Sequence, residues 1–103
     1  MKVIVDLCLV PIGVGTSLSP YITECEKILQ KAGLKTSLHA YGTNIEGNWD
    51  LVFAAIKDCH EKIHEKGAPR ISTVIKLGTR IDKAQTMEDK VKSVEKKLKD
   101  SSE

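Results

Sequence analysis

Residues 39–50 read His39-Ala40-Tyr41-Gly42-Thr43-Asn44-Ile45-Glu46-Gly47-Asn48-Trp49-Asp50. A strand pattern precedes this stretch and a long helical pattern follows it, so it joins two kinds of regular structure. Gly42 and Gly47 predict backbone turns with positive φ, which glycine adopts without steric cost. Asn48 is a residue type that caps helix N-termini. The stretch therefore predicts a hairpin that leads directly into a helix, and its many hydrogen-bonding groups predict the wall of a binding site.

Upstream of this stretch, alternating apolar side chains predict two strands, over residues 2–10 and 34–41. A helix lies between them, because apolar residues recur there at helical spacing. Ser19 is its expected N-cap, Pro20 its first-turn proline and Gly33 the residue that ends it. The first half of the chain is therefore a strand, a helix and a strand.

Downstream, the helix that Asn48 opens ends at Gly67, and residues 70–77 predict another strand. Thr86-Met87-Glu88-Asp89 resembles a capping box and predicts a final helix, with residues 100–103 expected to fray. The apolar stripe of this last helix consists of Met87, Val91, Val94 and Leu98.

The predicted element order is βαββαβ followed by one added helix. This order is typical of the ferredoxin-like fold, an α+β arrangement with an antiparallel sheet and both crossover helices on one face. We therefore expect one domain over residues 1–103 whose second sheet face is open. The polar side chains predicted on that open face are Asp6, Cys8, Ser37, His39 and Lys76.

The composition excludes several classes of protein. Sixteen basic and fourteen acidic residues give a net charge of +2, which is too balanced to indicate a nucleic-acid or membrane partner. With one Trp, two Tyr and one Phe, the sheet cannot offer the stacking surface that RNA-binding sheets use. Cys8, Cys25 and Cys59 are expected to be buried reduced thiols. We expect a cytoplasmic protein without a nucleic-acid or membrane partner and without a cofactor.

Two other sequence patterns have plain structural interpretations. His60-Glu61-Lys62-Ile63-His64 fits the H-E-x-x-H pattern of zinc hydrolases, but only one further histidine is available and the helix ends soon after it. A solvated last helical turn is the better interpretation, and no metal site is expected. The lysines of the final helix are mixed with acidic residues, which favours a solvated face over a phosphate-binding role: Lys90, Lys92, Lys96, Lys97 and Lys99.

Several segments carry a resemblance to a known family. They are Pro11-Ile12-Gly13, Gly42-Thr43-Asn44-Ile45-Glu46-Gly47 with Trp49-Asp50, His60-Glu61, Gly67-Ala68-Pro69-Arg70, Thr73-Val74-Ile75-Lys76 and Arg80-Ile81-Asp82-Lys83. With these segments the chain resembles, over nearly its whole length, the small thiamine-binding proteins of the YkoF-like ferredoxin fold. The resemblance implies a protein that binds thiamine or its hydroxymethylpyrimidine part without catalysing a reaction. It also implies assembly into dimers or tetramers, and we expect a homotetramer.

An aminopyrimidine needs a carboxylate or carbonyl acceptor together with a hydroxyl or amide group. The predicted ligand-binding residues are Asp6, Cys8, Ser37, His39, Thr43, Asn44, Glu46, Trp49 and Lys76. Structural roles remain open for some of them. Thr43 and Asn44 could satisfy the turn, Glu46 could cap a backbone group or pair with Lys76, and Trp49 could be a core anchor.

Two other classes of function remain open besides a non-catalytic binder. One is a metal-dependent hydrolase that uses His60, Glu61 and His64. The other is a structural or regulatory oligomeric subunit.

Overall fold

The elements follow the order that the sequence predicts. A computed structural model of the chain describes residues 1–101. Its elements are β1 (Lys2–Ile12), α1 (Ser19–Lys31), β2 (Lys35–His39), β3 (Gly42–Asn48), α2 (Trp49–Glu65), β4 (Arg70–Gly78) and α3 (Met87–Ser101). No helix of the described residues is long and apolar enough to cross a membrane.

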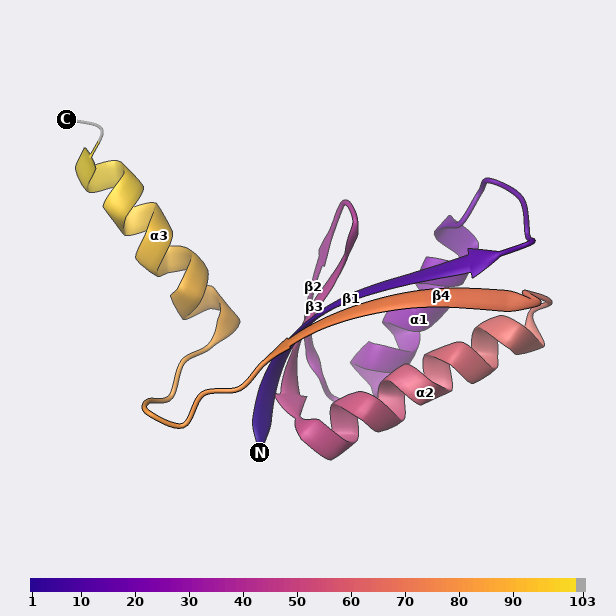
Figure 1. Cartoon of the computed structure of the whole chain (residues 1–103), viewed down its shortest axis with the longest axis horizontal. Coiled ribbons are helices and arrows are strands. Elements are labelled where there is room, and N and C mark those ends of the chain that lie inside the picture. The colour runs from indigo at the N-terminus through magenta and orange to yellow at the C-terminus, as the bar shows by residue number, and fades with distance from the viewer. Residues whose placement is uncertain (102–103) are drawn as a thin grey trace.

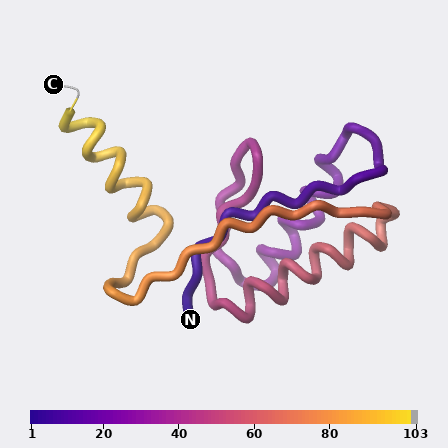
Figure 2. The backbone as a smooth tube through the Cα atoms, viewed as in Figure 1, coloured from indigo at the N-terminus to yellow at the C-terminus, as the bar shows by residue number. Residues whose placement is uncertain are grey.

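The four strands form one antiparallel sheet in the order β2-β3-β1-β4. Helices α1 and α2 cover one face of this sheet, whereas α3 extends away from the other elements (Figure 1). The backbone trace shows that the segment between β4 and α3 turns back before the helix begins (Figure 2). This is the predicted ferredoxin-like α+β arrangement with an added C-terminal helix, and the prediction of the fold is confirmed.

The core lies between the sheet and the two covering helices. Alternate residues of β1 are buried because successive side chains of a strand point to opposite faces. These residues pack with the apolar stripe of α2 and with Cys25 and Leu29 of α1. The buried residues of α2 are Val52, Ala55, Ile56, Cys59 and Ile63. The predicted stripe of this helix is confirmed.

The predicted boundary of β1 is short by two residues. Pro11 lies opposite Ile71 in the ladder between β1 and β4. Beyond Leu7, β1 has no partner on its β3 side, so a proline without an N–H is tolerated there. The prediction that the strand ends at residue 10 is therefore wrong.

The helix ends agree with the prediction in most places. The Asn48 Oδ1 accepts a hydrogen bond from the Asp50 N–H at 3.0 Å, which confirms the N-cap of α2. The N-cap of α1 is Leu18 instead of Ser19, which becomes the first helical residue and brings Pro20 into the first turn. Gly33 ends α1 with φ of +79°.

The capping box of α3 is confirmed. The Asp89 N–H donates to the Thr86 Oγ1 at 3.1 Å, and the Thr86 N–H donates to the Asp89 Oδ2 at 3.0 Å. The helix continues through Ser101, and the fraying expected from residue 100 onward stays a prediction, with residues 102–103 outside the described residues. Of its apolar stripe Met87 alone is buried, and the exposed members are Val91, Val94 and Leu98.

Gly42 and Gly47 are needed for space and not for backbone conformation. Neither has a positive φ, so that part of the prediction is wrong. A Cβ atom at Gly42 would lie 2.6 Å from the Leu7 carbonyl oxygen, and one at Gly47 would lie 2.5 Å from Leu34 Cδ2. Both positions lie where β3 approaches other buried parts of the chain too closely for a side chain.

Replacing Gly42 with alanine should destabilise the fold by roughly 1–3 kcal/mol, because the Leu7 carbonyl belongs to the rigid β1 backbone and has to shift. Urea unfolding of Gly42→Ala measures this loss. Gly78→Ala is the matched control, since a Cβ atom there meets nothing within 4 Å. Equal unfolding free energies for the two variants would contradict the steric explanation.

Candidate functional site

A row of polar side chains crosses the open face of the sheet. Strand register places Ser37 opposite Asn44, Asn44 opposite Asp6, and Asp6 opposite Lys76. Each strand therefore contributes one member at the same level of the sheet. Four of the predicted ligand-binding residues come together in this row, which runs hydroxyl, amide, carboxylate and ammonium from β2 to β4.

His39 adds an imidazole beside the row. Its Nε2 lies 2.7 Å from the Asp6 Oδ1, and both side chains are partly exposed. The contact fixes the orientation of the Asp6 carboxylate while involving only one of its two oxygens. The other oxygen can accept a hydrogen bond from a ligand.

A cavity of about 630 Å³ lies against this row. This volume is within the range of small-molecule sites. Its floor is the open face of β1, β3 and β4, and its wall is the segment that joins β4 to α3. The lining residues are Lys2, Ile4, Val5, Asp6, Asn44, Lys76, Leu77, Gly78, Thr79, Arg80, Ile81, Lys83, Ala84, Gln85 and Lys90.

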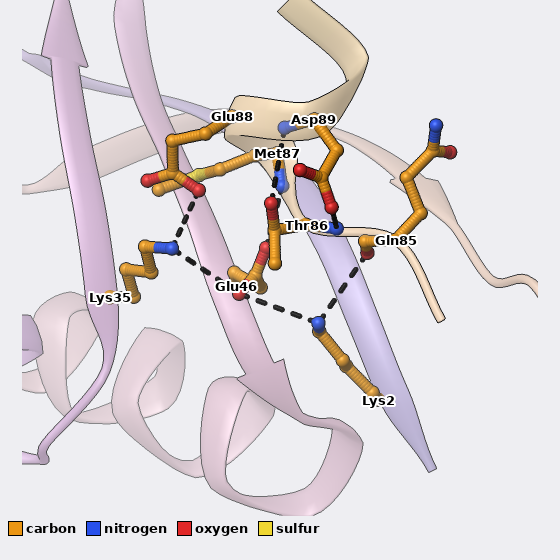
Figure 3. A network of polar contacts seen from close by, with 8 residues as sticks. All are labelled: Lys2, Lys35, Glu46, Gln85, Thr86, Met87, Glu88 and Asp89. Carbon is orange, nitrogen blue, oxygen red and sulfur yellow. Dashed lines mark hydrogen bonds and ion pairs between the residues drawn. The ribbon is translucent and has the colours of Figure 1, made fainter. Parts of the chain in front are cut away.

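The Glu46 carboxylate holds this wall in place (Figure 3). Glu46 is buried, and its Oε1 accepts a hydrogen bond from the Met87 N–H at 2.7 Å. Its Oε2 lies 3.5 Å from the Lys2 Nζ and 3.9 Å from the Lys35 Nζ. The carboxylate is thus occupied by the first residue of α3 and by two ammonium groups.

Two further contacts surround this anchor. The Lys35 Nζ donates to the Glu88 carboxylate at 2.6 Å, which lowers the pKa of Glu88 and raises the pKa of Lys35. The Lys2 Nζ donates to the carbonyl oxygen of Gln85 at 3.4 Å. Of the two structural roles left open for Glu46, capping a backbone group is therefore the one that is present, and its ammonium neighbours come from β1 and β2 instead of Lys76.

The segment before α3 also has internal contacts. The Arg80 guanidinium donates to both oxygens of Asp82 at 2.6 and 2.9 Å, and to the Gln85 side-chain oxygen at 2.7 Å. The contact with Arg80 lowers the pKa of Asp82 to about 2. The wall of the cavity is thus built from a segment with its own polar framework.

A second, smaller cavity of about 270 Å³ lies near the tip of the β2–β3 hairpin. It is lined mostly by apolar side chains and includes three predicted residues, Cys8, His39 and Thr43. Thr43 does not lie on the open face, because it alternates with Asn44 along β3 and points towards α1. Its hydroxyl donates to the Glu26 Oε1 at 2.8 Å. Thr43 therefore lies on the helix-covered side of the sheet, apart from the polar row.

Three of the predicted residues line neither cavity. Ser37 is at the outer end of the polar row, and Glu46 is covered by the start of α3. Trp49 is the first residue of α2, with its ring centroid 5.1 Å from that of Phe53. Trp49 therefore lies apart from the polar row.

The larger cavity also contains residues that were not predicted as ligand contacts. Arg80, Lys83 and Gln85 lie on the wall, Lys2 lies on β1 at the floor, and Lys90 comes from the first turns of α3. The 80–83 segment is part of the family resemblance, which was an available signal for Arg80 and Lys83. Nothing in the local sequence separates Lys90 from the other lysines of its helix.

The histidines of the H-E-x-x-H pattern have structural partners. The His60 Nε2 lies 2.8 Å from the Thr73 Oγ1, which links α2 to β4, and the His64 Nδ1 lies 2.8 Å from the Ala68 carbonyl oxygen. Burial, and then the nearby His64, lower the pKa of His60. Within residues 1–101 no group of three or more His, Cys, Asp or Glu side chains is placed to hold a metal ion.

The thiols divide into two environments. Cys25 and Cys59 are buried, and the Cys59 Sγ lies 3.7 Å from the Cys25 carbonyl oxygen. The neighbouring Cys25 and burial raise the pKa of the Cys59 thiol far above its ordinary value, so this thiol stays protonated. Cys8 is only partly buried, which corrects the expectation that all three thiols are buried.

A ferredoxin-like sheet with a ligand-sized cavity on its open face defines a small-molecule-binding module. The family model described as "Thiamine-binding protein" matches residues 5–95 of the chain. The chain therefore belongs to the thiamine-binding protein family, as the resemblance implied.

Relatives from distant organisms support this assignment. The UPF0045 protein sll0230 of Synechocystis is 60% identical over 98% of this chain and 84% of its own length. The UPF0045 protein ECM15 of Eremothecium gossypii is 48% identical over 97% of this chain and 96% of its own length. The crystal structure of MJ1052 from Methanocaldococcus jannaschii superposes with a TM-score of 0.83 at 31% identity, over 90% of this chain and 95% of its own.

Another solved structure shows the fold alone. The Thermotoga maritima protein TM0486, named for a role in thiamine biosynthesis or salvage, superposes with a TM-score of 0.77 at 21% identity. The comparison covers 91% of this chain and 99% of that one.

Glu46→Ala should release the start of α3, because the buried Met87 N–H loses its acceptor. The loss of one buried partner costs roughly 1–3 kcal/mol. Hydrogen exchange at the Met87 amide should accelerate, and the free energy of unfolding should fall. Glu88→Ala is the control, since it removes an exposed carboxylate from the same network and should change Met87 exchange much less. Unchanged Met87 protection in Glu46→Ala would remove the anchoring role.

Acidification should weaken the fold through His60. Its lowered pKa means that the folded chain binds this proton less readily than the unfolded chain, whose histidine titrates near 6.5. Stability is therefore lost as the pH falls below about 6.5. His60→Gln should show a shallower decline in unfolding free energy between about pH 7.5 and 5, while Glu61→Gln keeps the full decline. Identical pH profiles for His60→Gln and the unmodified protein would contradict this assignment.

Proposed function

We propose that the protein binds thiamine, or its hydroxymethylpyrimidine part, in the cavity on the open sheet face and does no chemistry on it. The observation that carries this proposal is the cross-strand row, which brings Asp6, Asn44 and Lys76 to the lining of the 630 Å³ cavity. Membership in the thiamine-binding family supports the class of ligand.

The row fits the hydrogen-bonding edge of an aminopyrimidine. The exocyclic amino group donates, and the Asp6 carboxylate is an acceptor whose position is set by His39. The ring nitrogens accept, and the Asn44 amide can donate to one of them. Non-polar side chains such as Ile4 and Leu77 supply apolar surface for the ring.

The alternative of a metal-dependent hydrolase has less support. A zinc-binding His60 would have to give up its contact with Thr73, and His64 its contact with the Ala68 carbonyl. Neither of the two cavities described above is lined by a residue of α2. The role of a passive binder agrees better with these contacts.

The proposal includes assembly into a homodimer or homotetramer. Val91, Val94 and Leu98 are each more than half exposed along a helix that extends from the rest of the chain. Such a stripe is typical of a helix face that another chain covers. A second copy of this chain is the proposed partner.

Calorimetric titration with thiamine and with hydroxymethylpyrimidine tests the proposal. Asp6→Ala should weaken binding by on the order of tenfold to a hundredfold, because a charge-assisted hydrogen bond contributes roughly 1.5–3 kcal/mol. Asp58→Ala removes an exposed carboxylate of α2 that lines neither cavity, so this variant should bind the ligand like the unmodified protein. The thiamine proposal fails if neither compound binds more tightly than millimolar while the protein remains folded.

A further inference from the structure

We propose that the cavity carries a phosphate subsite formed by Lys76, Lys83 and Lys90, so that the preferred ligand is a phosphate ester of the thiamine or pyrimidine compound. This inference deepens the proposed function and rests on it for the organic part of the ligand. The phosphate part rests on the charges of the cavity alone.

The lining of the cavity has a strong excess of positive charge. Its cationic residues are Lys2, Lys76, Arg80, Lys83 and Lys90, and its one acidic residue is Asp6. The chain as a whole is nearly balanced, with sixteen basic and fourteen acidic residues. The fold has therefore gathered cations at this place from β1, β4, the following segment and α3.

The cations fall into two groups. Lys2 pairs with Glu46, and Arg80 pairs with Asp82, so these two are engaged within the protein. In the described part of the chain, Lys76, Lys83 and Lys90 form no ion pair or hydrogen bond with another side chain. Asp6 lies opposite Lys76, and Lys83 contributes to the lowered pKa of Asp82, but neither carboxylate forms an ion pair with these lysines. Three ammonium groups thus line one cavity without an ion-pair partner in the described part of the chain.

This arrangement disfavours unmodified thiamine as the best ligand. Its thiazolium ring is a cation, which is best placed beside negative charge or over an aromatic face. The cavity lining contains no aromatic residue, and its lone carboxylate, Asp6, already contacts His39. A phosphate group reverses the charge balance, because each ammonium group then meets an anion.

The subsite is also held in position before a ligand arrives. Arg80 is fixed by Asp82 and Gln85, and the carbonyl of Gln85 accepts from Lys2. The hydrogen bond between Glu46 and the Met87 N–H then sets where the first turns of α3, including Lys90, begin (Figure 3). Lys83 and Lys90 are therefore presented by a braced segment to the face that holds Lys76, next to Asp6 in the row.

The affinity of the compounds should follow their phosphate charge. An exposed ammonium–anion contact contributes up to roughly fivefold in affinity, so three contacts predict a gain on the order of tenfold or more for thiamine diphosphate over thiamine. Calorimetry with thiamine, thiamine monophosphate and thiamine diphosphate measures this gain. The gain should shrink as salt is raised from about 0.05 to 0.5 M, because exposed charges are screened.

The double variant Lys83→Gln/Lys90→Gln should lose most of the gain for the diphosphate and keep the affinity for unmodified thiamine. Lys96→Gln/Lys97→Gln is the matched control, because it removes the same charge from exposed positions of α3 that lie outside the cavity lining. This control should keep the full preference for the phosphate ester. Circular dichroism of each variant verifies that it is folded.

Inorganic pyrophosphate separates this inference from the proposed function. Binding of pyrophosphate that is lost in the Lys83/Lys90 variant supports the subsite even when thiamine itself does not bind. Tight thiamine binding without any preference for its phosphates, and without pyrophosphate binding, overturns the subsite and leaves the proposed function standing. A preference that survives equally in both double variants also overturns it.

Discussion

The hydrogen bond from the Met87 N–H to the buried Glu46 carboxylate determines how α3 meets the sheet. Besides it, α3 is joined to the sheet by the buried Met87 side chain and by the exposed ion pair of Lys35 with Glu88, and such an exposed pair contributes little in water. The carboxylate satisfies a backbone donor that the capping box leaves free, and Lys2 and Lys35 offset its charge. This buried contact anchors the wall of the larger cavity, and the exposed contacts of Lys2 with Gln85 and of Lys35 with Glu88 support it.

The binding face follows from strand register. Because side chains alternate along a strand, one register places Ser37, Asn44, Asp6 and Lys76 in a row and sends Val5 and Ile45 into the core. The same alternation takes Thr43 away from the row. The same strand pairing therefore produces both the polar floor of the cavity and the apolar core. A shift of the strand register by one residue would move each set of side chains to the wrong face.

Most of the fold could be predicted from the sequence. The two-residue and 3.6-residue periods gave the element order, and Asn48, Gly33 and Thr86 marked helix ends through local chemistry. The end of β1 at Ile12 could not be predicted, because the strand tolerates Pro11 only where β3 no longer pairs with it, beyond Leu7. Glu46 shows the same limit at the site: its type indicated a polar role, but its partner lies 41 residues away in sequence. Lys90 likewise enters the cavity through tertiary placement alone.

The position of α3 would link the proposed assembly to the proposed ligand binding. Its buried end fixes the wall of the cavity, while its far turns present Val91, Val94 and Leu98 to the surroundings. A rigid helix transmits a displacement at one end to the other, so a partner that displaced the exposed turns would also change the width of the cavity. By thermodynamic reciprocity, a ligand that favours one width must favour or oppose that association by the same factor. Apparent affinity would then depend on protein concentration, even though no residue of the exposed turns touches the ligand.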